Sequence, residues 1–140
     1  MEEKKVTVSI KGAQKQDGEV NNTELFTEGK FYKENSNYVL KYQESEMTGL
    51  EGTTTTIEIG KDKVSLIRTG SVNNQMLFIE GKKTTSYYNT MYGSLIVGVM
   101  ADKLEASVDD NGGKLDINYI LDINEEYIGE NSILITIKEA

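Results

Sequence analysis

Apolar and polar residues alternate in strand-length segments along the whole chain. The segments recur about every 10 to 12 residues and are separated by Gly, Asn, Asp and Lys, a spacing typical of antiparallel barrels and sandwiches. No stretch shows a helical period. The pattern predicts about ten strands, at 4–11, 22–34 with a bend at Gly29, 37–46, 52–60, 63–69, 73–80, 83–91, 94–102, 114–122 and 132–139.

Short connections between successive strands favour an up-and-down meander. Closing such a sheet into a barrel removes the exposed edges that a sheet of this size would otherwise present. The chain contains no Pro to interrupt the ladders. We therefore predict a single all-β domain over residues 1–140, a closed or nearly closed antiparallel barrel of eight to ten strands, with the last strand beside the first.

The only arginine of the chain, Arg68, is predicted to point into this barrel. The other fourteen of its fifteen basic residues are lysines. A hairpin connection at 60–63 sets Thr55 opposite Arg68 and puts both on the face that carries Val64 and Leu66. The guanidinium would then lie on the apolar, inward face of its strand.

The next two hairpins extend this position into a polar band. A connection at 70–72 sets Asn74 opposite Arg68, and a turn at Gly81-Lys82 then sets Asn89 opposite Asn74, with Tyr87 two residues before Asn89 and on the same face. A shift of one residue in either hairpin would turn its strand over and remove the band.

Residues Leu95 to Met100 are apolar on both faces of their strand. A strand of this kind is normally covered on both sides. We expect its outer side to be covered by another segment of the chain or by a second protomer, which makes this strand the candidate surface for a homodimer.

Composition excludes many kinds of chemistry. The chain has no Cys and no His, so it lacks thiolate nucleophiles, thiolate metal sites and the commonest general base. The segment "DDNGG" at 109–113 has too few ligands for an EF-hand loop and favours a tight turn. We expect a protein without catalytic activity, cofactor or metal, and an enzymatic mechanism would have to rest on Glu and Tyr alone.

Charge and the N-terminal pattern bear on partners and location. The formal net charge is −8, and the lysines are dispersed among acids, so nucleic acid is not an expected partner. The first ten residues lack the apolar core of a signal peptide, and no segment has membrane-spanning length. We expect a cytoplasmic protein that does not contact a membrane.

The order of motifs from residue 38 to residue 93 resembles one protein family. "YVLKYQESEMTGLEGTTTTIEI", "VSLIRTG", "MLFIEG" and "YYNTMYG" are similar to the YwiB-like family of bacterial proteins, uncharacterised calycin-like barrels grouped as a domain of unknown function. The resemblance implies a lipocalin-like closed barrel and supplies no activity. It rests on Tyr42, Glu44, Gly49, Arg68, Gly70, Phe78, Gly81, Tyr87, Thr90 and Gly93, and it extends through "GGKLDINYIL" and "LITIK".

Two hypotheses for Arg68 follow from its inward position. As an anion clamp, its planar donors would hold the head group of a small amphipathic or anionic ligand inside the barrel. As a structural residue, it would pair with Glu44 or Glu46. The candidate ligand-binding residues are Arg68, Asn74, Tyr87, Asn89, Thr55 and Tyr42. The alternative function is a protein-interaction or assembly module with a solidly packed barrel.

Overall fold

The computed structural model describes residues 3–44, 51–71, 73–90 and 93–140, and within these ranges it contains ten strands and no helix. The all-β prediction is therefore confirmed. The strands are β1 (Lys4–Gln16), β2 (Glu19–Glu34), β3 (Asn37–Gln43), β4 (Thr53–Ile59), β5 (Lys63–Gly70), β6 (Asn74–Ile79), β7 (Lys83–Thr90), β8 (Gly93–Asp109), β9 (Gly112–Ile123) and β10 (Glu126–Glu139). These ranges therefore contain no membrane-spanning helix.

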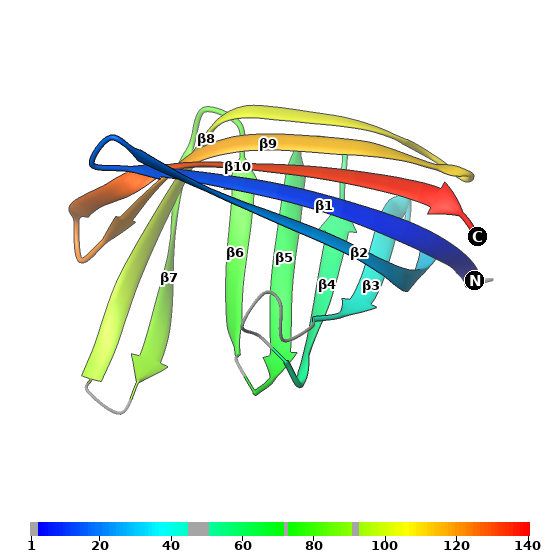
Figure 1. The fold of residues 1–140 in the computed structure, drawn as a ribbon, viewed down its shortest axis with the longest axis horizontal. Coiled ribbons are helices and arrows are strands. Elements are labelled where there is room, and N and C mark those ends of the chain that lie inside the picture. The colour runs from blue at the N-terminus through cyan, green and yellow to red at the C-terminus, as the bar shows by residue number, and fades with distance from the viewer. Residues whose placement is uncertain (1–2, 45–50, 72, 91–92) are drawn as a thin grey trace.

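The strands form one antiparallel sheet that curls into a nearly closed barrel. Their order is β6-β5-β4-β3-β2-β1-β10-β9-β8-β7, so each strand lies beside its neighbour in sequence except at β6 and β7, and β1 pairs with β10 as predicted. In Figure 1, β8, β9, β10, β1 and the first part of β2 run together as one layer, and β3 to β6 cross beneath it. The two chain ends lie close together at one end of the barrel.

The bend of β2 turns the sheet from one layer into the other. Residues 19–31 of this strand pair with β1, and residues 29–34 pair with β3. Gly29 belongs to both ladders, opposite Val6 on one side and Tyr42 on the other. A Cβ at Gly29 would lie 2.6 Å from the carbonyl oxygen of Lys41, so glycine is what lets the backbones approach at this corner.

The predicted registers of β4, β5 and β6 are confirmed. Thr55 pairs with Arg68, and Arg68 pairs with Asn74. Their apolar neighbours Leu66 and Phe78 lie in the core. These hairpins have short connections, and short connections leave little freedom in the register.

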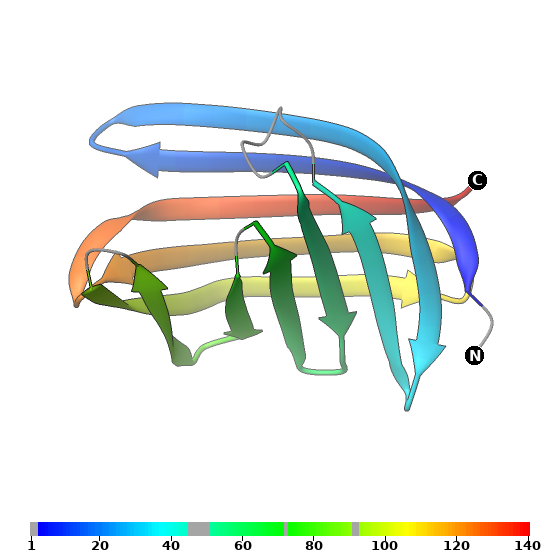
Figure 2. The ribbon, with the colours of Figure 1, turned by 90° about the horizontal axis from the view of Figure 1, so that it is seen from below.

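The predicted ladder between β6 and β7 is wrong. The turn is formed by Glu80 and Gly81, one residue earlier than expected, and the two strands share a single bridge, from Ile79 to Lys82. Beyond it, the Thr84 hydroxyl donates to the carbonyl of Leu77, and the Ser86 hydroxyl donates 2.8 Å to the carbonyl of Gln75. Figure 2 shows β7 leaning away from β6 along this seam.

The turn between β6 and β7 instead attaches to β8, which closes the barrel. The N–H of Gly81 donates 2.9 Å to the carbonyl of Ala101, and the carboxylate of Glu80 accepts the N–H of Leu104 at 3.0 Å. A bulge between Ala101 and Lys103 lies at this point of β8. Bulges re-aim backbone groups, and this one lies where the turn of a neighbouring hairpin meets the strand.

One continuous apolar core lies between the two layers. Phe78 is fully buried, and its ring packs against Tyr119 at 4.9 Å between centroids. At the end of the barrel near the termini, Phe31 stacks on Tyr38, whose hydroxyl donates 2.6 Å to Asp110. This hydrogen bond raises the pKa of Tyr38, and it joins β3 to the turn between β8 and β9. The largest fully buried side chains are Phe31, Phe78, Leu40, Ile57, Leu115, Ile117 and Ile135.

The outer side of the apolar strand segment 95–100 is covered only in part by the chain itself. Gly98 lies under the side chains of Lys83 and Asp122, which form a 3.0 Å ion pair. Ile96 remains 38% exposed beside its cross-strand partner Tyr87, which is 72% exposed. These two side chains form an apolar pair on the surface.

Candidate functional site

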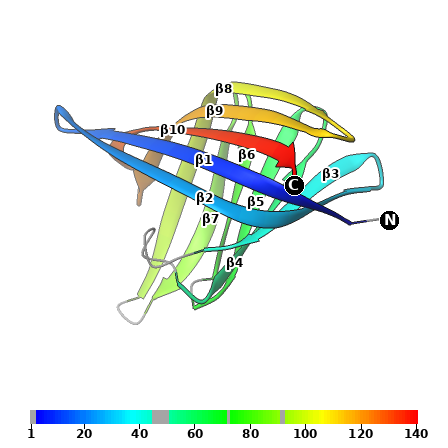
Figure 3. The same ribbon diagram turned by 45° about the vertical axis from the view of Figure 1, so that its right-hand side comes forward.

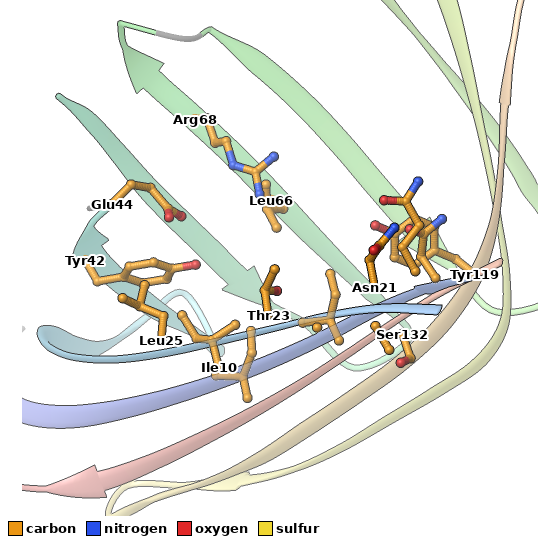
Figure 4. Close-up of a pocket in the computed structure, with 16 residues that line it drawn as sticks. Ile10, Asn21, Thr23, Leu25, Tyr42, Glu44, Leu66, Arg68, Tyr119 and Ser132 are labelled. Carbon is orange, nitrogen blue, oxygen red and sulfur yellow. The ribbon is translucent and has the colours of Figure 1, made fainter. Parts of the chain in front are cut away.

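A cavity of about 310 Å³ lies between the two layers, and Figure 4 shows it in close-up. One wall comes from β3 and β5 and carries Tyr42, Glu44, Leu66 and Arg68; in Figure 4 these side chains face Ile10, Leu25, Thr23, Asn21 and Ser132 across the space. Asn21 and Thr23 are exposed to solvent and mark the mouth. The remaining lining residues are Gly12, Ala13, Gln14, Tyr119, Asn131, Ile133 and Ile135.

A row of polar side chains crosses β3, β4, β5 and β6 at one level. Tyr42 pairs with Thr55, Thr55 with Arg68, and Arg68 with Asn74. Paired residues of neighbouring strands share a face, and the buried members Tyr42 and Thr55 show that this face is the inner one. The inward position predicted for Arg68 is confirmed, because its side chain lines the cavity.

The polar contacts of Arg68 are incomplete within the described part of the chain. No salt bridge joins it to a carboxylate among the residues that the structure describes, and its Nε is buried without a hydrogen-bond partner. Of the two predicted partners, Glu44 lines the same cavity, and Glu46 lies outside the described residues. A buried donor without a partner costs about 1–3 kcal/mol, so the burial of this Nε is unfavourable unless an acceptor reaches it.

Glu44 is held by hydroxyl groups on the same face. The Thr55 hydroxyl donates 2.7 Å to Oε1 of Glu44, and the Tyr42 side chain hydrogen-bonds with both residues. Burial raises the pKa of Tyr42 far above its ordinary value; the negative charge of Glu44 raises it further, while the positive charge of Arg68 acts in the opposite direction. The charges of Arg68 and Glu44 therefore shift the pKa of the Tyr42 hydroxyl in opposite directions.

Replacing Thr55 with valine should lower the free energy of unfolding by about 1.5–3 kcal/mol, since the change keeps the shape but removes a buried donor to a carboxylate. Urea unfolding at pH 7 measures the difference. Thr56→Val is the matched control, because Thr56 is only half-buried and lies on the opposite face, where a change should stay within about 0.5 kcal/mol. Equal losses for the two variants would show that the bond to Glu44 does not matter.

The predicted site residues fall into three groups. Arg68 and Tyr42 line the cavity, and Thr55 lies beneath it as the donor to Glu44. Asn74 continues the polar row but lies outside the cavity wall, with its Oδ1 buried and unpaired. Tyr87 is on the outer face of the barrel, because β7 does not follow the predicted register.

The last predicted member of the band, Asn89, has its side chain outside the part of the chain that the structure describes. Its backbone pairs with Ser94 in the β7–β8 hairpin. The predicted cross-strand pair of Asn89 and Asn74 is not formed, because β6 and β7 share only the bridge near their turn.

A second polar wall was missed by the sequence analysis. Gln14 and Asn21 lie in the arms of the β1–β2 hairpin, which projects beyond the barrel in Figure 3, and Asn131 lies on β10 with its Nδ2 buried and unpaired. The signal in this region was the pair Asp17-Gly18, whose positive φ values of 53° and 80° form the tight turn. Asp-Gly is a strong hairpin signal, but the polar arms beside it lack the alternation that marks a strand.

The cavity combines charged, polar and apolar groups. The described residues contain no group of three or more acidic, His or Cys side chains arranged to hold a metal ion. The cavity presents one guanidinium, one carboxylate, several amide and hydroxyl groups, and apolar floor residues such as Leu66 and Ile135. An arrangement of a mostly apolar surface with a few convergent polar groups is typical of small-molecule sites.

Comparisons with known proteins agree on one family. The model of a domain of unknown function, DUF1934, matches residues 8–135. The chain is 24% identical over 136 residues to the uncharacterized β-barrel protein YwiB of Bacillus subtilis (strain 168), covering 96% of this chain and 94% of that protein. The crystal structure of the ywiB protein from Bacillus subtilis superposes with a TM-score of 0.76 at 22% identity, over 96% of this chain and 92% of that one.

Proposed function

Because the chain belongs to the DUF1934 family of β-barrel proteins, whose name assigns no activity, we propose from the cavity alone that it is a non-enzymatic binding protein for a small amphipathic molecule. The observation that supports this is a solvent-reachable cavity into which Arg68 points without an ion pair among the described residues. The polar head of the ligand lies at Arg68, and its apolar part lies on Leu66 and Ile135. We also propose that the protein is cytoplasmic.

Size and chemistry both favour a ligand over a packed interior. Ligand sites in proteins commonly measure about 300–1,000 Å³, and this cavity, at about 310 Å³, lies at the lower end of that range. A guanidinium presents paired donors in one plane. A ligand acceptor that approaches Arg68 from the cavity would give the guanidinium a hydrogen-bond partner.

Native mass spectrometry of the protein purified from cells tests the proposal. We expect the wild-type protein to retain a bound small molecule and Arg68→Ala to lose it, because the head group loses its donors. Lys63→Ala is the matched control, since it removes one positive charge from the exposed start of the same strand and should leave binding unchanged.

The stability of Arg68→Ala separates binding from a structural role. Since Arg68 has no ion pair with any residue that the structure describes, the free energy of unfolding should change by no more than about 1 kcal/mol, whereas removing one partner of a buried pair costs about 3–5 kcal/mol. A ligand-free wild-type protein combined with a large stability loss in Arg68→Ala would overturn the proposal.

The exposed pair of Tyr87 and Ile96 supports a second candidate function, an interaction or assembly module. These side chains lie opposite one another on β7 and β8 and are largely open to solvent, and aromatic residues are enriched in protein interfaces. A second protomer seated on the 95–100 segment would cover them. In the same mass spectra, a dimer that Tyr87→Ser converts to a monomer would favour this function.

A further inference from the structure

The cavity holds two opposite charges, and this balance limits what the head group of a ligand can be. Resting on the proposed binding function, we propose that the site takes a head group without net negative charge, a carboxamide-like or zwitterionic group, and discriminates against a bare carboxylate. The observation is that Arg68 and Glu44 line the same cavity.

The two charged groups occupy fixed positions on one wall. Glu44 directly follows the end of β3, two residues beyond Tyr42, and its backbone N–H donates 2.9 Å to the carbonyl of Thr53. Arg68 lies on β5, one strand beyond Thr55, whose hydroxyl donates to Glu44. In Figure 4 the carboxylate and the guanidinium point into the same space from these neighbouring positions.

Glu44 is also among the least exposed polar residues of the wall, at 8% relative exposure. Its charge is therefore poorly screened by water. A ligand carboxylate at Arg68 would place a second negative charge in this enclosed space, and like charges at a shared site oppose each other's ionisation.

A neutral head group avoids this repulsion and still satisfies the guanidinium. The oxygen of a carboxamide accepts a hydrogen bond from Arg68 as a carboxylate oxygen does, but it brings no charge to be desolvated. A zwitterion adds a positive charge on the side of Glu44 and keeps the sum at zero. The arrangement therefore selects by charge and leaves the apolar part of the ligand unrestricted.

Octanamide and octanoate are suitable probes, because they have the same number of heavy atoms and differ mainly in charge. Isothermal titration calorimetry at pH 7 should give at least tenfold tighter binding of octanamide to the wild-type protein. Glu44→Gln removes the competing charge and leaves Arg68 uncompensated, so the preference should reverse in favour of octanoate. Arg68→Gln should lose octanoate binding entirely and weaken octanamide less.

The outcomes separate the inference from the function on which it rests. Octanoate binding to the wild-type protein as tightly as octanamide, with a preference that Glu44→Gln leaves unchanged, would overturn the charge argument and keep the binding function. Absence of binding by both probes to the wild-type protein would overturn both. The wild-type comparison needs no variant, so it decides the question even if Glu44→Gln fails to fold, which thermal unfolding monitored by circular dichroism shows.

Discussion

Phe78→Ala is expected to lower the free energy of unfolding by about 3–5 kcal/mol, the range for removing a fully buried aromatic ring. Phe78 has no exposed surface and packs against Tyr119, a residue of the opposite layer that also lines the cavity. Its loss leaves a void where the layers meet. Domains of this size are stable by about 5–15 kcal/mol, so the variant would lose a large share of its stability.

Guanidinium chloride unfolding at 25 °C measures this effect, and Phe26→Ala is the control. Phe26 lies on the outer face of β2 with 71% of its surface exposed, so its truncation should change stability by no more than about 0.5 kcal/mol. The same chemical change thus has two different expected costs, set by burial alone. Similar losses at both positions would show that Phe78 does not lie in the core.

Gly29→Val is expected to lower the free energy of unfolding by about 3 kcal/mol or more, because the added side-chain atoms would push apart two backbone segments that lie close together. The new Cβ would meet the backbone oxygen of Lys41 at 2.6 Å and the Cβ of Tyr42 at 3.3 Å. Neither can move without shifting β3, so the corner between the layers would open. Because Tyr42 lines the cavity, ligand binding should weaken with it.

Gly18→Ala serves as the control for Gly29→Val. Gly18 has a φ of 80°, and an added Cβ would meet no atom within 4 Å. The Gly18→Ala change should therefore lower the free energy of unfolding by only about 1–2 kcal/mol, the cost of holding a residue with a Cβ in a left-handed conformation. Thermal unfolding of both variants compares the two effects, and a Gly29 variant as stable as the Gly18 variant would contradict the packing argument.

The parts of the fold that short hairpins determine could be predicted from the sequence. The connections at 60–63 and 70–72 left few alternative registers, so the pairs of Arg68 with Thr55 and Asn74 followed from arithmetic. The turn after β6 did not follow, because Gly81 serves as its second residue and its N–H bonds to Ala101, far away in sequence. A tertiary contact of this kind cannot be read from the local alternation of apolar and polar residues.

The candidate site was predictable in one wall only. Arg68 and Tyr42 alternate with apolar neighbours, and this alternation revealed their direction. Asn21 and Gln14 belong to the projecting arms of β1 and β2, where both faces are polar and the period is hidden. Asn131 lies just past a bulge between Tyr127 and Gly129, which shifts the alternation of β10 by one residue in a way that sequence alone does not show.

The seam between β6 and β7 has fewer backbone hydrogen bonds than the other junctions between neighbouring strands that the structure describes. The other neighbouring strands in the described ranges are joined by backbone ladders, two of which contain a bulge. Here Thr84 and Ser86 hold β6 by their hydroxyls, and the bridge from Ile79 to Lys82 anchors one end. Swinging the β7 edge outward would break few bonds and leave the core between the layers in place. Local opening of the barrel wall is therefore expected to begin along this seam.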